Sequence, residues 1–163
     1  MKSIFALVLF VTSTLFVNAQ NFEPDYPKTI PTFQFAKIKG EGIFESKEIK
    51  KNKQTLIGFV SPECIHCVLS IQHLYNNYNL LENINLIFVT EYEKDVFSNK
   101  VKVIAPDFFT NQNIQILQDT EGEFIEKFKP LTLPTFYLFD KKGNLEAVKR
   151  GSIEINQIFQ LIH

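Results

Sequence analysis

The chain has no tryptophan, only two cysteines and no excess of either charge. Its 17 basic residues nearly balance its 18 acidic ones, and the formal net charge is −1. This balance gives no reason to expect nucleic acid or an anionic membrane as a partner. With 17 phenylalanines and no tryptophan, the core of this one-domain-sized chain is expected to consist largely of phenylalanine. The phenylalanines are interpreted as core rather than as a cofactor site, and no cofactor is expected.

The N-terminus is typical of a secretory signal peptide. Lys2 supplies a positive charge, Ile4–Phe16 is mostly apolar, and Val17-Asn18-Ala19 ends on a small residue. The apolar run is short for a membrane span of about 20 residues, and no cysteine directly follows it that could carry a lipid anchor. We therefore expect a cleaved signal peptide at residues 1–19, a periplasmic or secreted protein, and no stable membrane insertion after cleavage. An uncleaved N-terminal anchor is the alternative.

After an extended, proline-containing leader at residues 20–30, residues 31–163 are expected to form one domain. The hydrophobic patterns predict a β-hairpin and then strands that alternate with helices. The predicted strands are residues 32–39, 43–44, 55–60, 83–90, 113–118, 135–139 and 145–150. The predicted helices are residues 46–51, 65–79, 93–99, 121–128 and 155–162.

Segment 101–116 has no clear periodicity, although Val101–Ile104 is compatible with a strand. Strands separated by helices imply parallel crossovers, and the closing hairpin adds antiparallel strands. The sequence therefore predicts an α/β protein, a three-layer α/β/α sandwich with a mixed sheet and an N-terminal β-hairpin extension.

Both cysteines lie in one motif, Cys64-Ile65-His66-Cys67, where an apolar strand leads into an amphipathic helix. At a helix N-terminus, free backbone N–H groups and the helix dipole favour a thiolate at Cys64. Cys67 follows one turn later, close enough for a disulfide. A purely structural disulfide is the alternative, but a bridge that closes so small a ring removes little chain entropy. The motif therefore predicts disulfide exchange, with Cys64 attacking and Cys67 resolving.

Three motifs occur in order along the chain: Phe59–Cys67, Leu133-Pro134-Thr135-Phe136 and Asp140–Asn144. Together they resemble the thioredoxin superfamily, and within it the extracytoplasmic TlpA/ResA-like branch, over about Pro31 to the C-terminus. The N-terminal hairpin is similar to the extension of that branch and of peroxiredoxins. The resemblance implies a thioredoxin-like fold and an exported thiol–disulfide oxidoreductase. It also implies that protein thiols or disulfides are the substrates, and that a membrane or periplasmic redox partner exists.

The resemblance further implies a cis peptide bond before Pro134, with Leu133 and Pro134 facing the cysteines and binding substrate. The chain also departs from the family. Glu63 replaces the usual tryptophan, Ile65-His66 replaces Gly-Pro, and Gly58 stands where thioredoxins proper bury an acid. These departures leave the fold expectation intact but argue against a general cytosol-type reductant.

Glu63 and His66 are expected to tune the Cys64 thiol in opposite directions. A histidine beside the thiolate can donate a hydrogen bond or carry a positive charge, and either favours the anion. The negative charge of Glu63 disfavours it. The sequence therefore leaves open whether the protein acts as an oxidant, a reductant or an isomerase.

Three other readings compete. The first is a binding or chaperone module that keeps the fold without redox turnover. The second, a metal site built from Cys64, His66 and Cys67, is disfavoured because the adjacent His66 and Cys67 point in different directions and no second cluster completes four ligands. A peroxidase is disfavoured because the Thr-x-x-Cys pattern is missing, with Ser61 as the nearest hydroxyl. No metal is expected.

Overall fold

The computed structural model describes residues 24–154, 156–157 and 160. The expected signal peptide at 1–19 lies outside these residues, and so do the first part of the leader and most of the helix expected at 155–162. Residues 24–30 are not helical, and Thr29 forms a single antiparallel bridge with Asn144.

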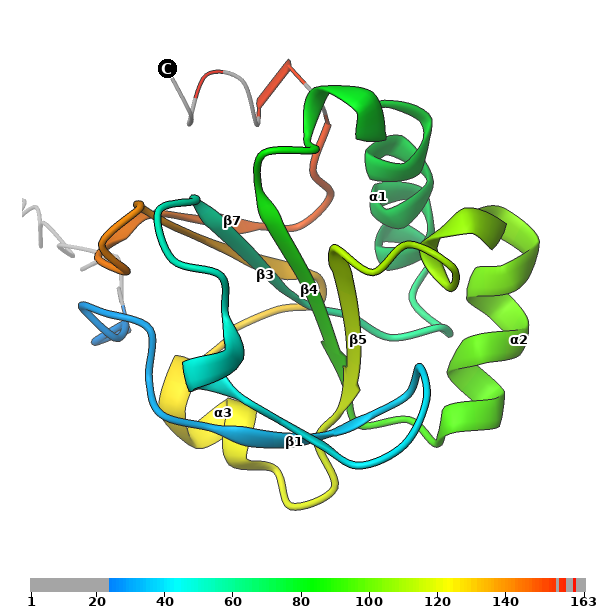
Figure 1. Cartoon of the computed structure of the whole chain (residues 1–163), viewed down its shortest axis with the longest axis horizontal. Coiled ribbons are helices and arrows are strands. Elements are labelled where there is room, and N and C mark those ends of the chain that lie inside the picture. Colours follow the sequence, from blue (N-terminus) through cyan, green and yellow to red (C-terminus); the bar gives the residue numbers. More distant parts are fainter. Residues whose placement is uncertain (1–23, 155, 158–159, 161–163) are drawn as a thin grey trace, which may run out of the picture.

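A seven-stranded mixed sheet lies at the centre of the described chain (Figure 1). Its strands are β1 (Gln34–Lys37), β2 (Ile43–Glu45), β3 (Thr55–Phe59), β4 (Asn85–Thr90), β5 (Ile114–Gln118), β6 (Thr135–Phe139) and β7 (Leu145–Arg150). The strand order is β2-β1-β5-β4-β3-β6-β7. The pairs β3–β4 and β4–β5 are parallel, and all other neighbours are antiparallel. The N-terminal hairpin therefore extends the sheet beside β5.

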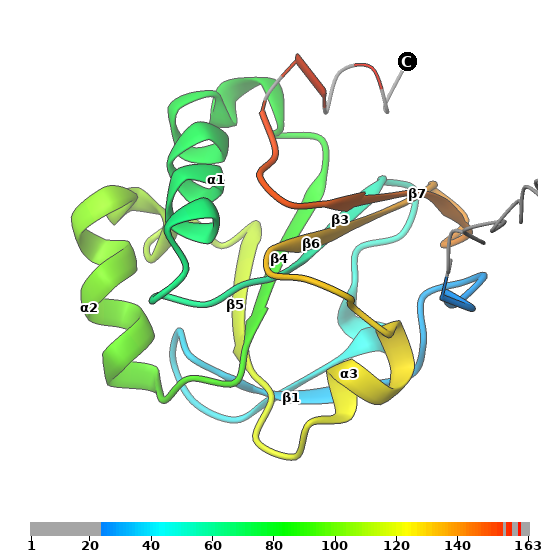
Figure 2. The same ribbon diagram turned by 180° about the vertical axis from the view of Figure 1, so that it is seen from behind.

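Helices cover both faces of this sheet, which confirms the predicted α/β class. Helices α1 (Ile65–Asn76) and α2 (Lys94–Ile104) pack on one face, and the short α3 (Glu123–Phe128) lies on the other (Figure 2). Short 3₁₀ turns occur at Ser46–Glu48, Tyr78–Leu80 and Pro106–Phe108.

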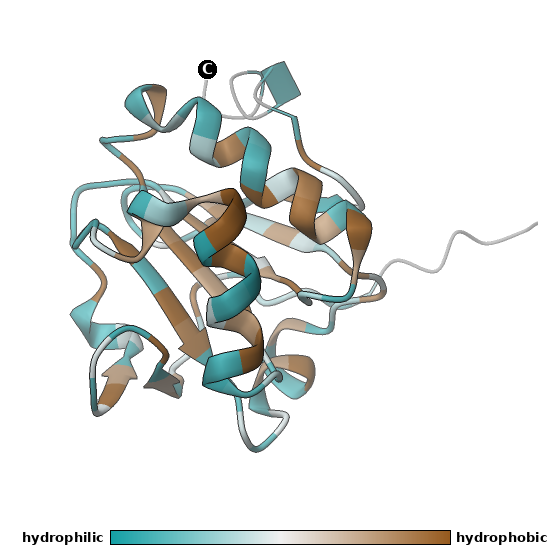
Figure 3. Ribbon diagram, turned by 90° about the vertical axis from the view of Figure 1, so that its right-hand side faces the viewer, coloured by the Kyte–Doolittle hydropathy of each residue, from teal (hydrophilic) through white to brown (hydrophobic). Residues whose placement is uncertain are grey.

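Strands β3 and β4 are buried along their whole length because both sheet faces are covered. Side chains alternate between the faces, so Leu56 packs under α1 and α2 whereas Ile57 and Phe59 pack toward α3. The α3 face is rich in phenylalanine, as expected: Phe33, Phe35, Phe44, Phe59, Phe124, Phe128 and Phe139 are all buried there. Figure 3 shows hydrophobic residues along the strands and mixed hydropathy along the two long helices.

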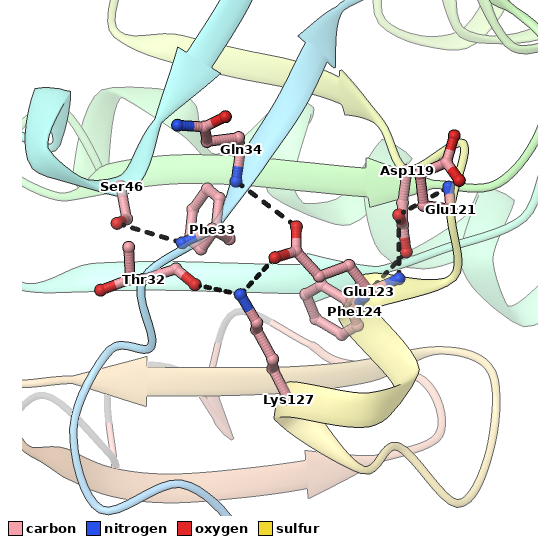
Figure 4. Close-up of polar contacts among 9 residues, drawn as sticks. All are labelled: Thr32, Phe33, Gln34, Ser46, Asp119, Glu121, Glu123, Phe124 and Lys127. Atoms are coloured by element: carbon pink, nitrogen blue, oxygen red, sulfur yellow. Dashed lines mark hydrogen bonds and ion pairs between the residues drawn. The ribbon is translucent and has the colours of Figure 1, made fainter.

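Asp119 and Lys127 fix α3 to the rest of the fold (Figure 4). The buried Asp119 carboxylate accepts hydrogen bonds from the backbone N–H groups of Glu123 (3.1 Å) and Phe124 (2.8 Å), at the start of α3. Lys127 Nζ donates to the carbonyl oxygen of Thr32 and also pairs with Glu123. These contacts join α3 to the segment that leads into the N-terminal hairpin.

The structure corrects the strand considered at Val101–Ile104, which forms the end of α2 instead. Phe97 and Val101 are both buried, four residues apart on one helical face, whereas Val103 is 81% exposed. The segment after α2 is held by Lys39, whose Nζ donates to the carbonyl oxygens of Phe108 (2.9 Å), Ile114 (2.8 Å) and Asn111.

Candidate active site

The two cysteines lie at the junction between β3 and α1. Cys64 is the N-cap of α1, and its Sγ accepts a hydrogen bond from the backbone N–H of Cys67 at 3.4 Å. The turn before it is set by Ser61: its Oγ accepts from the N–H of Glu63 (3.2 Å) and its carbonyl oxygen accepts from the N–H of Cys64 (3.3 Å). A thiolate at Cys64 therefore has a backbone donor in place.

The two sulfur atoms are free thiols in very different surroundings. Cys64 is partly exposed, whereas Cys67 is completely buried among the residues beneath α1. Burial raises the pKa of the Cys67 thiol to about 12, and its hydrogen bond with Cys64 adds to the shift. Cys67 therefore carries its proton at neutral pH, and Cys64 is the sulfur that a substrate can reach.

Leu133, the residue before Pro134, lies beside Cys64 in the structure. The Leu133–Pro134 peptide bond is cis, and the pairing of Phe59 with Thr135 places this loop at the carboxyl end of β3. Cys64 Sγ lies 3.6 Å from the carbonyl oxygen of Leu133, in hydrogen-bond geometry. An exposed apolar surface surrounds the thiol: Ile65, Leu69, Leu131 and Leu133 are 39–62% exposed.

Glu63 is held by a residue that sequence reasoning missed. Tyr92, in the loop after β4, donates its hydroxyl to Glu63 Oε2 at 2.9 Å. The signal that could have found Tyr92 is its place just beyond the carboxyl end of a parallel strand, since these ends meet at one edge of the sheet. Tyr92 thus orients the carboxylate next to Cys64 in sequence.

His66 is exposed, and its ring faces the segment after β7. Its Nδ1 lies 3.0 Å from Ser152 Oγ. Ser70 strengthens this junction: its Oγ donates to the carbonyl oxygen of His66 (2.7 Å) and accepts from the N–H of Ile153 (3.0 Å). Among the described residues, no hydrogen bond joins the imidazole to the sulfur of Cys64. The role of His66 in tuning the Cys64 thiol stays a prediction, and such a role would rest on the charge of the imidazole and not on a hydrogen bond.

The position of Gly58 is too tightly packed for a side chain. A Cβ added to Gly58 would lie 2.6 Å from Cε1 of Phe136. The Phe136 ring, which belongs to the same core cluster as Cys67, fills this space and leaves no room for the acid that thioredoxins proper place there. Nor do the described residues contain any group of three or more His, Cys, Asp or Glu side chains that could hold a metal ion.

No family model matches this chain. Sporulation thiol-disulfide oxidoreductase A of Bacillus subtilis (strain 168) is 24% identical over 145 residues, which cover 88% of this chain and 85% of that protein. The crystal structure of StoA from Bacillus subtilis is similar with a TM-score of 0.64 and 21% identity, covering 84% of this chain and all of that one. A secreted disulfide oxidoreductase of Mycobacterium tuberculosis is similar with a TM-score of 0.65 and 14% identity, covering 80% of this chain and 93% of that one. The likeness thus spans the whole fold and not only the cysteine motif.

Proposed function

We propose that the chain is a thiol–disulfide oxidoreductase of the thioredoxin superfamily, which exchanges disulfides with exported proteins through Cys64 and Cys67. One observation carries the assignment of roles: Cys64 is reachable and capped by a backbone N–H, whereas Cys67 is buried and protonated one turn away. Cys64 is therefore the attacking thiol and Cys67 the resolving thiol.

In the reducing direction, the Cys64 thiolate attacks one sulfur of a substrate disulfide. A mixed disulfide forms, and the other substrate sulfur leaves as a thiolate. Because Cys67 holds its proton, it attacks only after losing that proton, which the departing substrate thiolate can accept. Cys67 then attacks Cys64 Sγ, the Cys64–Cys67 disulfide forms, and the second substrate sulfur leaves as a thiolate that takes a proton from water. Two electrons pass from the protein to the substrate, and the same steps in reverse oxidise a dithiol.

The surface around Cys64 supports a polypeptide as substrate. The Leu133 carbonyl oxygen can accept a hydrogen bond from a substrate backbone N–H beside the reacting sulfur, because it lies 3.6 Å from Cys64 Sγ. The exposed side chains of Ile65, Leu131 and Leu133 offer apolar contacts to residues that flank the substrate cysteine. Leu133 and Pro134 are thus the substrate-binding residues in this proposal.

The N-terminal sequence supports an exported protein. Ile4–Phe16 has the apolar character of a signal peptide, and one of the structural neighbours is described as secreted. In the part of the chain that the structure describes, no helix is long and apolar enough to span a membrane. A periplasmic or membrane redox protein would restore the Cys64–Cys67 pair after each turnover.

The test is insulin reduction with dithiothreitol and oxidation of reduced ribonuclease, with wild type, Cys64→Ser and a surface control. His73→Ser suits as control because His73 is exposed near the end of α1, away from the cysteines. We expect activity in the wild type and the control and none above buffer in Cys64→Ser. Equal activity in all three would reject the proposal. A Cys64–Cys67 pair that glutathione cannot reduce would favour the chaperone alternative.

A further inference from the structure

The edge of the sheet that carries Cys64 is acidic. Strands β3, β4 and β5 are parallel, so their carboxyl ends share one edge with the cysteines. The exposed charged side chains just beyond these three strands are largely carboxylates: Glu63, Glu91, Glu93 and Glu121.

The opposite edge is strongly basic and hollowed. A cavity of about 400 Å³ lies between the N-terminal leader, the segment before β3 and the β6–β7 turn. Six lysines line it: Lys47, Lys50, Lys51, Lys53, Lys141 and Lys142. Asp140 is the only acid in the lining. Since the whole chain has a net charge of −1, the remainder of the molecule is negative. Positive and negative charges are therefore unevenly distributed, although their totals nearly balance.

Half of these lysines have no partner in the described chain. Lys47 pairs with Glu45, Lys50 Nζ donates to Asn113 Oδ1, and Lys53 Nζ donates to a backbone carbonyl. The side chains of Lys51, Lys141 and Lys142 are exposed and form no ion pair or hydrogen bond within the described residues.

The acids nearest to these lysines have other partners. The Asp140 carboxylate accepts from the backbone N–H groups of Lys142 and Asn144, each at 2.8 Å, and from the Asn144 side chain. Glu146, beside the two turn lysines, accepts from Gln54 at 2.9 Å. Lys51, Lys141 and Lys142 thus form no ion pair with these two acids, and the six lysines outnumber them.

The cavity also marks the place where the N-terminal segment joins the fold. Thr29 and Ile30 line it, and the Ile30 N–H donates to the carbonyl oxygen of Gly143 at 2.9 Å. The Thr55–Phe139 and Phe59–Thr135 pairs set the cavity one strand length from Cys64, roughly 16 Å along β3. The described N-terminal residues before β1 therefore join the fold at the basic edge.

We propose that this basic cavity docks on the phosphate headgroups of an anionic membrane surface, so that the Cys64–Cys67 pair faces away from the membrane. The lysines come from two loops around an open hollow, which suits a surface with many phosphates. Export, which the expected signal peptide at residues 1–19 implies, brings the mature chain next to a membrane surface. Docking places the redox edge toward soluble protein substrates, and it is independent of the redox chemistry itself.

The test is co-sedimentation of the exported protein with phosphatidylglycerol-containing vesicles and with pure phosphatidylcholine vesicles. The triple variant Lys51→Gln/Lys141→Gln/Lys142→Gln removes the unpartnered charges. A variant with the same charge change elsewhere, Lys100→Gln/Lys102→Gln/Lys149→Gln, is the matched control. We expect the cavity variant to bind anionic vesicles at least about 10-fold more weakly and the control to stay within about twofold of wild type. Wild-type binding should fall between 50 and 200 mM salt, roughly as the Debye length shortens.

Three results would overturn the proposal: no preference of the wild type for anionic vesicles, equal weakening in both triple variants, or calorimetric binding of pyrophosphate without vesicle binding. The last result would identify a site for a small soluble anion. Insulin reduction by the cavity variant should match the wild type. Loss of vesicle binding with intact turnover thus separates this proposal from the proposed redox function.

Discussion

Cys64 and Cys67 stand one helical turn apart in opposite surroundings. Cys64 lies at the surface between the start of α1 and the Leu133 carbonyl oxygen. Cys67 is completely buried beneath the same helix. Two chemically identical groups are thus made different mainly by burial, and the difference gives each a separate step in disulfide exchange.

The contrast should be largest in alkylation kinetics. With the protein reduced at pH 7.5, iodoacetamide should modify Cys64 on the order of 1,000-fold faster than Cys67, because the reagent requires an accessible thiolate. Peptide mass spectrometry after timed quenching measures both rates. In 6 M guanidinium chloride the two rates should converge. Similar rates in the folded protein would show that burial does not separate the two thiols.

The buried thiol should also make stability depend on pH. The pKa of Cys67 is about 12 in the fold, against 9.0 for an ordinary thiol. Between these values the unfolded chain binds fewer protons than the folded one, so the free energy of unfolding falls as pH rises. We expect a loss on the order of 1 kcal/mol between pH 9 and 10.5, measured by urea denaturation.

The control for this prediction is Cys67→Ala, whose stability should fall less over the same range. The comparison of the two proteins is needed because Lys39 has the opposite effect. Burial lowers the pKa of Lys39 to about 8, so its contribution makes the fold more stable as pH rises from about 8 toward 10.5. Identical pH profiles for wild type and Cys67→Ala would contradict the assigned shift.

A smaller effect is expected from the charge beside the exposed thiol. Glu63→Gln removes a negative charge that disfavours the Cys64 thiolate, so the reduced form gains stability and the reduction potential rises by up to about 30 mV. Tyr92→Phe releases the carboxylate from its hydroxyl donor, and the potential should fall by a smaller amount. Equilibration with glutathione or dithiothreitol buffers measures both. Shifts of the opposite sign in the reduction potential would contradict the prediction that Glu63 tunes the Cys64 thiol.

Much of the fold was predictable because local patterns agree with the tertiary structure. The apolar runs of β3 and β4 are buried central strands, and the turn before β7 has Gly143 at a φ of 85°. The part of segment 101–116 that follows α2 was not predictable, since it is held by Lys39, which binds the carbonyl oxygens of Phe108, Asn111 and Ile114 from 69 or more residues away in sequence. The end of α2 was misjudged because a short apolar run fits either a strand or a helix.

The candidate site was predictable to the extent that it lies in contiguous motifs. The placement of Cys64, Cys67 and Leu133 follows from a strand-to-helix junction and an adjacent loop. Tyr92 and Ser152 were missed because they reach the motif from the ends of other strands. Strand order decides which of these ends are neighbours, and no local pattern reports it. The charge asymmetry between the two sheet edges was not predicted either, because net charge does not tell where in the fold the charged residues lie.

The most direct test of the central claim is to trap the mixed disulfide. Cys67→Ser keeps the exposed sulfur and removes the resolving one. Attack on a disulfide of native insulin or of a disulfide-bonded peptide should therefore stop at a covalent adduct. Non-reducing mass spectrometry should find one substrate chain linked to Cys64, released by dithiothreitol, and no adduct in Cys64→Ser. A folded Cys67→Ser protein whose Cys64 thiol remains free in the presence of excess disulfide would contradict the assignment of Cys64 as the attacking residue.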